Sequence, residues 1–177
     1  MTDAGRTSIL LAARRAFARQ PYAAVTLRGI AADAGVSASL IVKHFGGKDQ
    51  LFDVVSDFGE AAELLLAAPN ASLGRHAVLT LVRWRHENES DLLVRVVFAA
   101  GSGDERAMMR ERFRSQVVQA FADRLDGDNV DVRAELIVAH LLGLGALLAV
   151  RKTGPAATAD PELVADLYGP SLQALIG

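Results

Sequence analysis

Residues 26–45 read TLRGIAADAGVSASLIVKHF, and this stretch decides the fold. Thr26 is a residue of the kind that caps helix N-termini, and Gly35 can adopt the left-handed conformation that closes a helix. Only one residue separates that glycine from Ser37, which is a second candidate N-cap. The pattern therefore predicts two short helices joined by a Gly-Val-Ser turn.

A further helix is expected before this pair. Its pattern starts at a cap on Ser8 or Thr7, places Ile9, Ala13, Ala16 and Phe17 on one face, and stops at Pro21. Two short helices braced by a third have the geometry of a helix-turn-helix unit, in which one helix lies in the DNA major groove while its predecessor crosses the backbone. The expected core of this unit consists of Ile30, Ala31, Ala34, Val36, Ile41 and Phe45.

The remaining chain also has a helical pattern. Hydrophobic residues make up 51% of the sequence and aromatic residues only 6%, which favours packed helices over sheet. We expect an all-α protein of about nine helices, with a DNA-binding domain at 1–47 and a larger domain at 67–177. One linking helix is predicted at about 48–66. The helices of the larger domain are predicted at about 72–87, 91–100, 104–125, 131–152 and 161–176.

The sequence lacks the residues that several classes of functional site require. Without cysteine there can be no disulfide and no thiolate metal site, and His76, His86 and His140 are too scattered to indicate a metal site. The sequence also lacks a Gly-x-Ser-x-Gly elbow, a glycine-rich phosphate loop and a paired-carboxylate pattern. We therefore expect a protein that is not an enzyme and needs no cofactor or metal.

The distribution of apolar residues predicts a cytoplasmic protein with no membrane partner. The first apolar stretch, at 9–18, is split by Arg14 and Arg15, so it does not form the apolar region of a signal peptide. The longest apolar run is 136–150, interrupted by His140. It has ~15 residues, fewer than the ~20 that a spanning helix needs.

The N-terminal residues resemble the signature of the tetracycline-repressor (TetR/AcrR) family. The matching residues are Ile9, Leu10, Ala12, Ala13, Phe17, Thr26, Ile30, Ala31, Ala34, Gly35, Val36, Ser37, His44, Phe45, Lys48 and Leu51. The rest of the chain resembles the family's regulatory domain in helix count, length and order. This resemblance implies a homodimeric transcriptional repressor that is released from a pseudo-palindromic DNA operator by a small-molecule ligand.

The resemblance also implies which residues bind DNA. The family's phosphate contacts correspond to Thr26, His44 and Lys48 in this sequence. The family's contacts to base edges correspond to Arg28, Ala38, Ser39, Leu40 and Lys43. The chemistry agrees at Lys48, which begins a helix whose free backbone N–H groups also attract an anion.

Arg28 and Lys43 are the long donors near the turn, and either can bind guanine. The sequence departs from the family's pattern at three positions. Ser39 stands at the family's usual glycine of the third helix, Val42 at its usual tyrosine, and Pro21 at the glycine that ends its first helix. Valine cannot donate a hydrogen bond to phosphate, so one family contact is lost or replaced here.

A stripe of apolar residues in the larger domain has two interpretations, an ordinary core or the wall of a cavity. The resemblance implies that a small molecule binds among these helices. The candidate pocket residues are Trp84, Arg95, Phe98, Met109, Phe113, Val117, Phe121 and His140. Arg95 is the one charge in the apolar run 92–100, so it either reaches the surface or faces a polar group in the cavity.

The predicted helix at 131–152 is apolar nearly all round, so it must be covered on more than one side. We expect a second subunit to supply that cover, with the helix at 161–176 beside it, in a four-helix interface as in the family. The alternative is burial within one monomer. The candidate interface residues are Leu136, Gly143, Leu144, Leu147, Leu167 and Leu172.

A second function remains open at this point. In that alternative the protein binds DNA without a ligand, and its larger domain only dimerises or recruits a partner protein. A wholly packed larger domain with no cavity would favour it.

Overall fold

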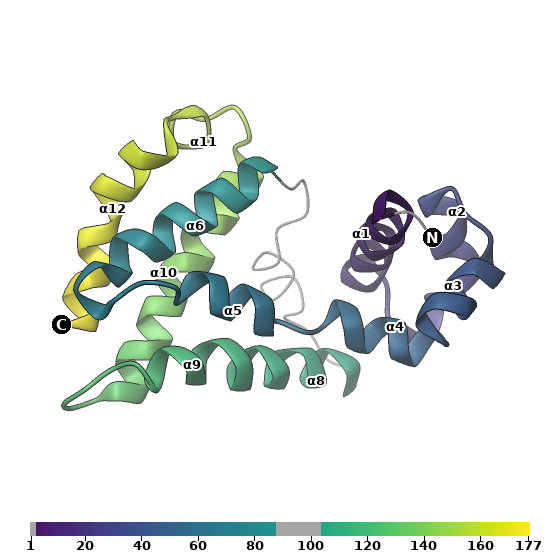
Figure 1. Cartoon of the computed structure of the whole chain (residues 1–177), viewed down its shortest axis with the longest axis horizontal. Coiled ribbons are helices and arrows are strands. Elements are labelled where there is room, and N and C mark those ends of the chain that lie inside the picture. The colour runs from purple at the N-terminus through teal and green to yellow at the C-terminus, as the bar shows by residue number, and fades with distance from the viewer. Residues whose placement is uncertain (1–2, 88–103) are drawn as a thin grey trace. The chain divides into compact units, whose positions relative to one another are not determined.

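The computed structural model describes residues 3–87 and 104–177, and within these ranges the regular structure is helical with no strand (Figure 1). The predicted all-α fold is therefore confirmed for this part of the chain. Contacts divide the chain into two compact units. One holds the described residues of Met1–Asp57 and Gly101–Met109, and the other holds those of Phe58–Ala100 and Arg110–Gly177.

The first unit contains the predicted helix-turn-helix. Its elements are α1 (Asp3–Arg19), the 3₁₀ turn η1 (Tyr22–Ala24), α2 (Leu27–Ala34), α3 (Ala38–Phe45) and α4 (Lys48–Val55). The centre of this unit is fully buried and apolar, and it includes Ile9, Ile30, Ile41 and Leu51. α1 begins five residues before the predicted Ser8 start, and it ends before Pro21, which cannot donate the next helical hydrogen bond.

Both predicted N-caps are present, Thr26 at the start of α2 and Ser37 at the start of α3. The hydroxyl of Thr26 accepts from the backbone N–H of Gly29 at 3.1 Å, and that of Ser37 accepts from Leu40 N–H at 3.2 Å. Gly35 has φ 68°, in the left-handed region that glycine enters without a steric penalty. The local signals of residues 26–45 therefore suffice to define both helices.

The prediction of one linking helix at about 48–66 is wrong. The structure has α4, then a break at Ser56–Phe58, then α5 (Gly59–Leu65). Ser56 donates its hydroxyl to the carbonyl of Phe52 at 2.6 Å. Phe58 N–H leaves the helical pattern and donates instead to the side chain of Gln116 at 2.7 Å. The partner of this N–H is thus a side chain 58 positions away, which local sequence does not reveal.

The second unit is a bundle. It contains α5, the 3₁₀ turn η2 (Asn70–Ser72), α6 (Leu73–Glu87), the end of α8 (Asp104–Phe113), the π-helical segment η3 (Arg114–Val118), α9 (Gln119–Ala122), α10 (Val130–Val150), the short α11 (Pro155–Thr158) and α12 (Pro161–Ile176). The predicted helix at 104–125 is present but contains the π segment. The predicted helix at 91–100 lies outside the described residues.

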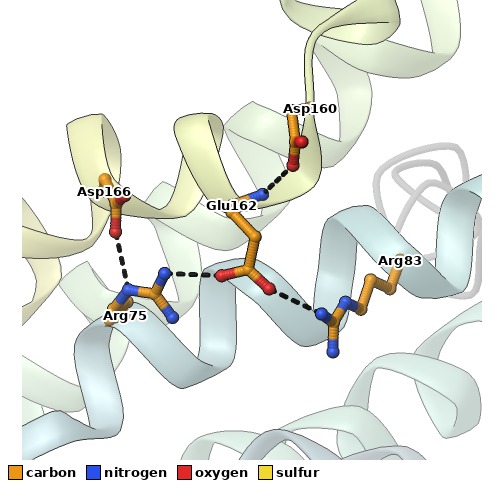
Figure 2. A network of polar contacts seen from close by, with 5 residues as sticks. All are labelled: Arg75, Arg83, Asp160, Glu162 and Asp166. Carbon is orange, nitrogen blue, oxygen red and sulfur yellow. Dashed lines mark hydrogen bonds and ion pairs between the residues drawn. The ribbon is translucent and has the colours of Figure 1, made fainter.

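α6 and α12 lie side by side and very close together (Figure 1). A Cβ added at Gly169 would come within 2.7 Å of Arg75 Cα, so only glycine fits there. Figure 2 shows the ion pairs along this seam: Arg75 binds Asp166 at 2.7 Å and Glu162 at 2.5 Å, and Arg83 binds Glu162 at 2.6 Å. The hydrogen bonds from Arg75 to Asp166 and then to Glu162 raise the pKa of Arg75 above its usual value.

α10 is longer than its apolar run suggested. With 21 residues, it is the one helix of the described chain that is long and apolar enough to cross a membrane. It packs against α6, α9 and α12, as the core helix of a bundle does. At its start Arg133 donates to the carbonyls of Leu175 at 2.8 Å and Ile176 at 2.8 Å, which ties α10 to the end of α12.

Candidate nucleic-acid interface

The exposed face of α3 consists of Ser39, Val42 and Lys43, which recur at helical spacing. Val42 is 50% exposed, whereas Ile41 on the opposite face is completely buried. This contrast fixes which side of α3 packs on the unit and which side is free to meet another molecule. Lys43 therefore has its long donor side chain on the free side.

The front of α3 presents short polar and apolar side chains. Ser39 is exposed, and its hydroxyl lies 3.0 Å from that of the cap residue Ser37. Ala38 and Leu40 are half-buried. Because none of these side chains is bulky and charged, the start of the helix can approach the base edges of a DNA groove closely.

The two candidates on the α2 side are also exposed. Arg28 lies in the first turn of α2, and Thr26 is its cap. The Thr26 oxygen accepts from Gly29 N–H, and a hydroxyl that accepts one bond still has a hydrogen to donate. Thr26 can therefore cap the helix and donate to a phosphate oxygen at the same time.

Lys48 stands at the first position of α4, and its side chain is held in place. Its Nζ donates to the carbonyl of Tyr22 at 3.0 Å and lies 4.1 Å from the centre of the Tyr22 ring. His44, in the last turn of α3, is exposed. The structure thus gathers Thr26, Arg28, Ala38, Ser39, Leu40, Lys43, His44 and Lys48 on α2, α3 and the start of α4 within one compact unit.

Sequence reasoning missed Tyr22. The available signal was an aromatic residue in the short segment between Pro21 and Thr26, where the neighbouring residues Ala23 and Ala24 are small. Its partner Lys48 is 26 positions away, so helical periodicity could not connect them.

The candidate pocket residues divide into four groups. Met109, Phe113, Val117 and Phe121 are all buried, at 5% exposure or less. Trp84 is half-buried on α6, and Arg95 and Phe98 lie outside the described residues. His140 lies beside Tyr168 of α12, with ring centroids 6.0 Å apart.

Four of the six candidate interface residues are exposed. Leu136, Leu147 and Leu167 are 45%, 49% and 75% exposed, and a side chain added at Gly143 would meet no atom within 4 Å. Leu144 and Leu172 are 6% and 0% exposed in the single chain, so their side chains belong to its own core. They point into the core of their own chain, a distinction that apolar character alone cannot make.

The first unit therefore defines a class of protein, one with a helix-turn-helix unit that exposes Arg28 on α2 and Lys43 on α3. The sequence comparisons define the family. Residues 9–55 match bacterial regulatory proteins of the tetR family, and residues 71–176 match the tetracyclin repressor-like C-terminal domain. The chain belongs to the tetR family of DNA-binding transcriptional regulators, which are not enzymes.

Individual relatives agree with this assignment. An HTH-type transcriptional repressor of Mycobacterium tuberculosis is 31% identical over 148 residues, covering 77% of this chain and 68% of the relative. The crystal structure of a TetR-family regulator from Streptomyces coelicolor A3 is 28% identical, with a TM-score of 0.61, covering 98% of this chain and 94% of that one. NalD, the secondary repressor of the MexAB-OprM multidrug efflux pump in Pseudomonas aeruginosa, has the same fold at 22% identity, with a TM-score of 0.62 and coverage of 97% and 96%.

Proposed function

We propose that the protein is a cytoplasmic repressor that binds a pseudo-palindromic operator as a homodimer and leaves it when a small molecule binds. The observation that carries the proposal is the free face of α3, where Ser39, Val42 and Lys43 are exposed while Ile41 is completely buried. A helix fixed on one side and free on the other is what insertion into a major groove requires.

The residues divide by chemistry into two roles. Arg28 and Lys43 carry long donors that bind the O6 and N7 acceptors of guanine, while Ala38, Ser39 and Leu40 contact base edges at close range. Thr26, His44 and Lys48 bind phosphates and set the register of the protein on the duplex.

The exposed apolar surface supports the homodimer. Leu136 and Leu147 on α10 and Leu167 on α12 are 45%, 49% and 75% exposed. Large apolar side chains gathered on neighbouring helices favour cover by another protein surface. A two-fold dimer would use the same surface in both copies and would match the symmetry of a palindromic operator.

Release by a ligand is proposed to act through the start of α5. The buried stripe of Phe113, Val117 and Phe121 is the candidate cavity wall, and it continues to Phe58 through an edge-on contact with Phe113 at 5.3 Å between ring centroids. A ligand that separates these rings would shift the segment that joins the two units. Coupling of ~1–3 kcal/mol would change operator affinity about 5- to 150-fold.

One observation is compatible with the alternative function as well. Phe113, Val117 and Phe121 are 5%, 1% and 0% exposed, as expected for a packed core as well as for a closed cavity. A larger domain that is packed throughout would only dimerise or recruit a partner, and operator binding would then be independent of small molecules.

Selection of bound fragments from the DNA of the source genome tests the proposal. We expect the protein to recover a palindrome whose half-sites lie one or more helical turns apart. The Lys43→Ala variant should recover a palindrome with a changed base preference, while Lys48→Ala should bind the original sequence more weakly. Recovery of fragments without a common palindrome would contradict the proposal.

The ligand is tested on the recovered operator. Substrates and products of the enzymes encoded beside it are added to the complex, and operator release is measured by fluorescence anisotropy. Release by one of these compounds supports ligand control. At constant protein concentration, the ligand concentration that gives half-release should also shift when operator affinity is changed. Binding that no neighbouring compound alters supports the alternative function.

A further inference from the structure

Tyr22 occupies a central position in the first unit although it lies in a three-residue turn. Its ring stacks on Phe17 of α1 at 5.7 Å between centroids and meets Phe52 of α4 edge-on at 5.3 Å. Phe17 and Phe52 are themselves packed edge-on at 5.1 Å and are 7% and 6% exposed. The position of the Tyr22 ring is therefore set by two nearly buried aromatic side chains.

The same residue holds the ammonium group of Lys48 in two ways. The Tyr22 carbonyl accepts a hydrogen bond from Nζ at 3.0 Å, and the ring lies beneath Nζ at 4.1 Å from its centroid. An ammonium group has three hydrogens, so the bond to the carbonyl leaves two donors for an incoming anion. The negative ring face attracts the cation without using a donor.

Tyr22 also holds the next residue of α4. Its hydroxyl is hydrogen-bonded to the carboxylate of Asp49. The first turn of α4 is closed on its other side by Gln50, whose side-chain oxygen accepts from Gly47 N–H at 2.9 Å. One aromatic residue thus contacts the side chains of both Lys48 and Asp49 at the start of α4.

We propose that Tyr22 is a positioning residue for DNA binding, which acts by holding Lys48 ready for a phosphate before DNA arrives. This inference rests on the proposed function, and in particular on the phosphate contact of Lys48. A free lysine side chain loses rotamer freedom when it binds, whereas one already held by a carbonyl and a ring loses less. Tyr22 itself touches no DNA in this proposal.

The test is a double-mutant cycle between Tyr22 and Lys48, with operator affinity measured over a series of salt concentrations. The probe is a duplex carrying the palindrome recovered from the genomic selection. Lys48→Ala should lower the slope of log affinity against log salt by about 0.9 for each subunit that loses its contact. Tyr22→Leu, which removes the ring, should lower affinity while changing the slope little, because Lys48 can still bind the phosphate, whereas Tyr22→Phe should retain most of the affinity.

The decisive comparison is made in the Lys48→Ala background. There, Tyr22→Leu should cause no further loss of affinity, because the lysine through which it acts is absent. An equal loss of affinity with and without Lys48 would overturn the proposal, as would a Tyr22→Leu variant that keeps the full affinity.

A second series of variants keeps an aromatic ring at position 22, so its result does not depend on whether Tyr22→Leu folds. Phenylalanine and increasingly fluorinated phenylalanines at position 22 keep the ring while weakening its attraction for a cation. Operator affinity should fall along the series when Lys48 is present and stay level in Lys48→Ala. Parallel trends in both backgrounds would overturn the proposal.

The failures of the two proposals are distinguishable. If the unmodified protein binds the operator and Lys48→Ala keeps its full salt slope, the positioning role of Tyr22 is wrong while operator binding stands. If the unmodified protein does not prefer any palindrome, operator recognition itself is wrong, and with it the inference.

Discussion

Single residues at the DNA-binding face serve the fold and the proposed contact together. Thr26 caps α2 through Gly29 N–H and keeps its own hydroxyl hydrogen. Lys48 bonds to the Tyr22 carbonyl and keeps two donors. Substitution of either residue will therefore change stability as well as DNA affinity, and the salt dependence of binding is needed to separate the two effects.

Val42 and Ser39 are the two residues on the exposed face of α3 that depart from the family pattern, and Val42 is the one that replaces a hydrogen-bond donor. It is 50% exposed, between Ser39 and Lys43 on the same face. We predict that Val42→Tyr adds a phosphate hydrogen bond worth about 0.5–1.5 kcal/mol and tightens binding roughly 2- to 10-fold. Anisotropy titrations with the operator and with an unrelated duplex should show the gain on both, because phosphates carry no sequence information.

The matched control is Val42→Phe, which has the same ring without the hydroxyl. If phenylalanine tightens binding as much as tyrosine does, the gain comes from apolar contact and the phosphate explanation is wrong.

Among the elements, α6 and α12 form the most closely packed pair in the second unit. Gly169 and Gly74 allow the approach, since a Cβ at Gly74 would lie 2.6 Å from the backbone nitrogen of Gln173. The Gln173 side chain in turn accepts from Gly74 N–H at 3.0 Å. The exposed ion pairs of Figure 2 lie beside this contact between α6 and α12. They add little to the stability of the fold by themselves, because solvent screens them.

We predict that Gly169→Ala destabilises the protein by about 1–3 kcal/mol, the usual cost of overpacking. The added Cβ would lie 2.7 Å from Arg75 Cα, and a backbone atom cannot rotate away. Urea unfolding measures the change. Ser171→Ala, at an exposed position of the same helix, is the control and should be nearly neutral; equal stability of the two variants would show that the helices are not in close contact.

The π segment η3 places Gln116 beside the start of α5. Its side-chain oxygen accepts from Phe58 N–H at 2.7 Å, where the predicted linking helix breaks. A π turn inside a helix realigns the side chains that follow it and often marks a functional position. The coupling between the larger domain and the DNA-binding unit is therefore expected to depend on this hydrogen bond.

Replacement of Gln116 by methionine should destabilise the protein by about 1–3 kcal/mol, since a part-buried N–H loses this acceptor. Gln116→Glu keeps an acceptor oxygen and should lose less. Chemical denaturation of both variants measures the difference. A methionine variant as stable as the glutamate variant would mean that the hydrogen bond does not hold the start of α5.

For the whole molecule, the notable feature is apolar surface without cover in the single chain. Only 39% of the most apolar part of α10 is buried, although its composition is that of a core helix. Leu167 on the neighbouring α12 is 75% exposed. These exposed side chains are the reason to expect that the functional unit contains two copies of the chain.

Gly143→Arg should convert the proposed dimer to monomers, measured by sedimentation velocity. A side chain at Gly143 meets no atom within 4 Å in the single chain, so the fold of the monomer should survive while two like charges oppose each other across a two-fold interface. Ala67→Arg adds the same charge at an exposed position outside α10 and α12 and should leave the dimer intact. A Gly143→Arg protein that still sediments as a dimer would place the interface elsewhere.

The sequence by itself determined the elements whose signals are local. The caps Thr26 and Ser37 and the left-handed Gly35 lie within a few residues of the helices they end, so the helix-turn-helix and the candidate DNA-binding residues on it could be predicted. The start of α12 at Pro161, after the Asp160 cap, could be predicted for the same reason.

Only the tertiary structure decided the features that depend on distant partners. Gln116 accepts from Phe58 N–H at the break in the linking segment from 58 positions away, and Tyr22 holds Lys48 from 26 positions away. Leu172 and Leu167 are both leucines of α12, yet one is completely buried and the other 75% exposed. Burial and side-chain hydrogen bonding depend on which elements meet in space, and the periodicity of one helix does not contain that information.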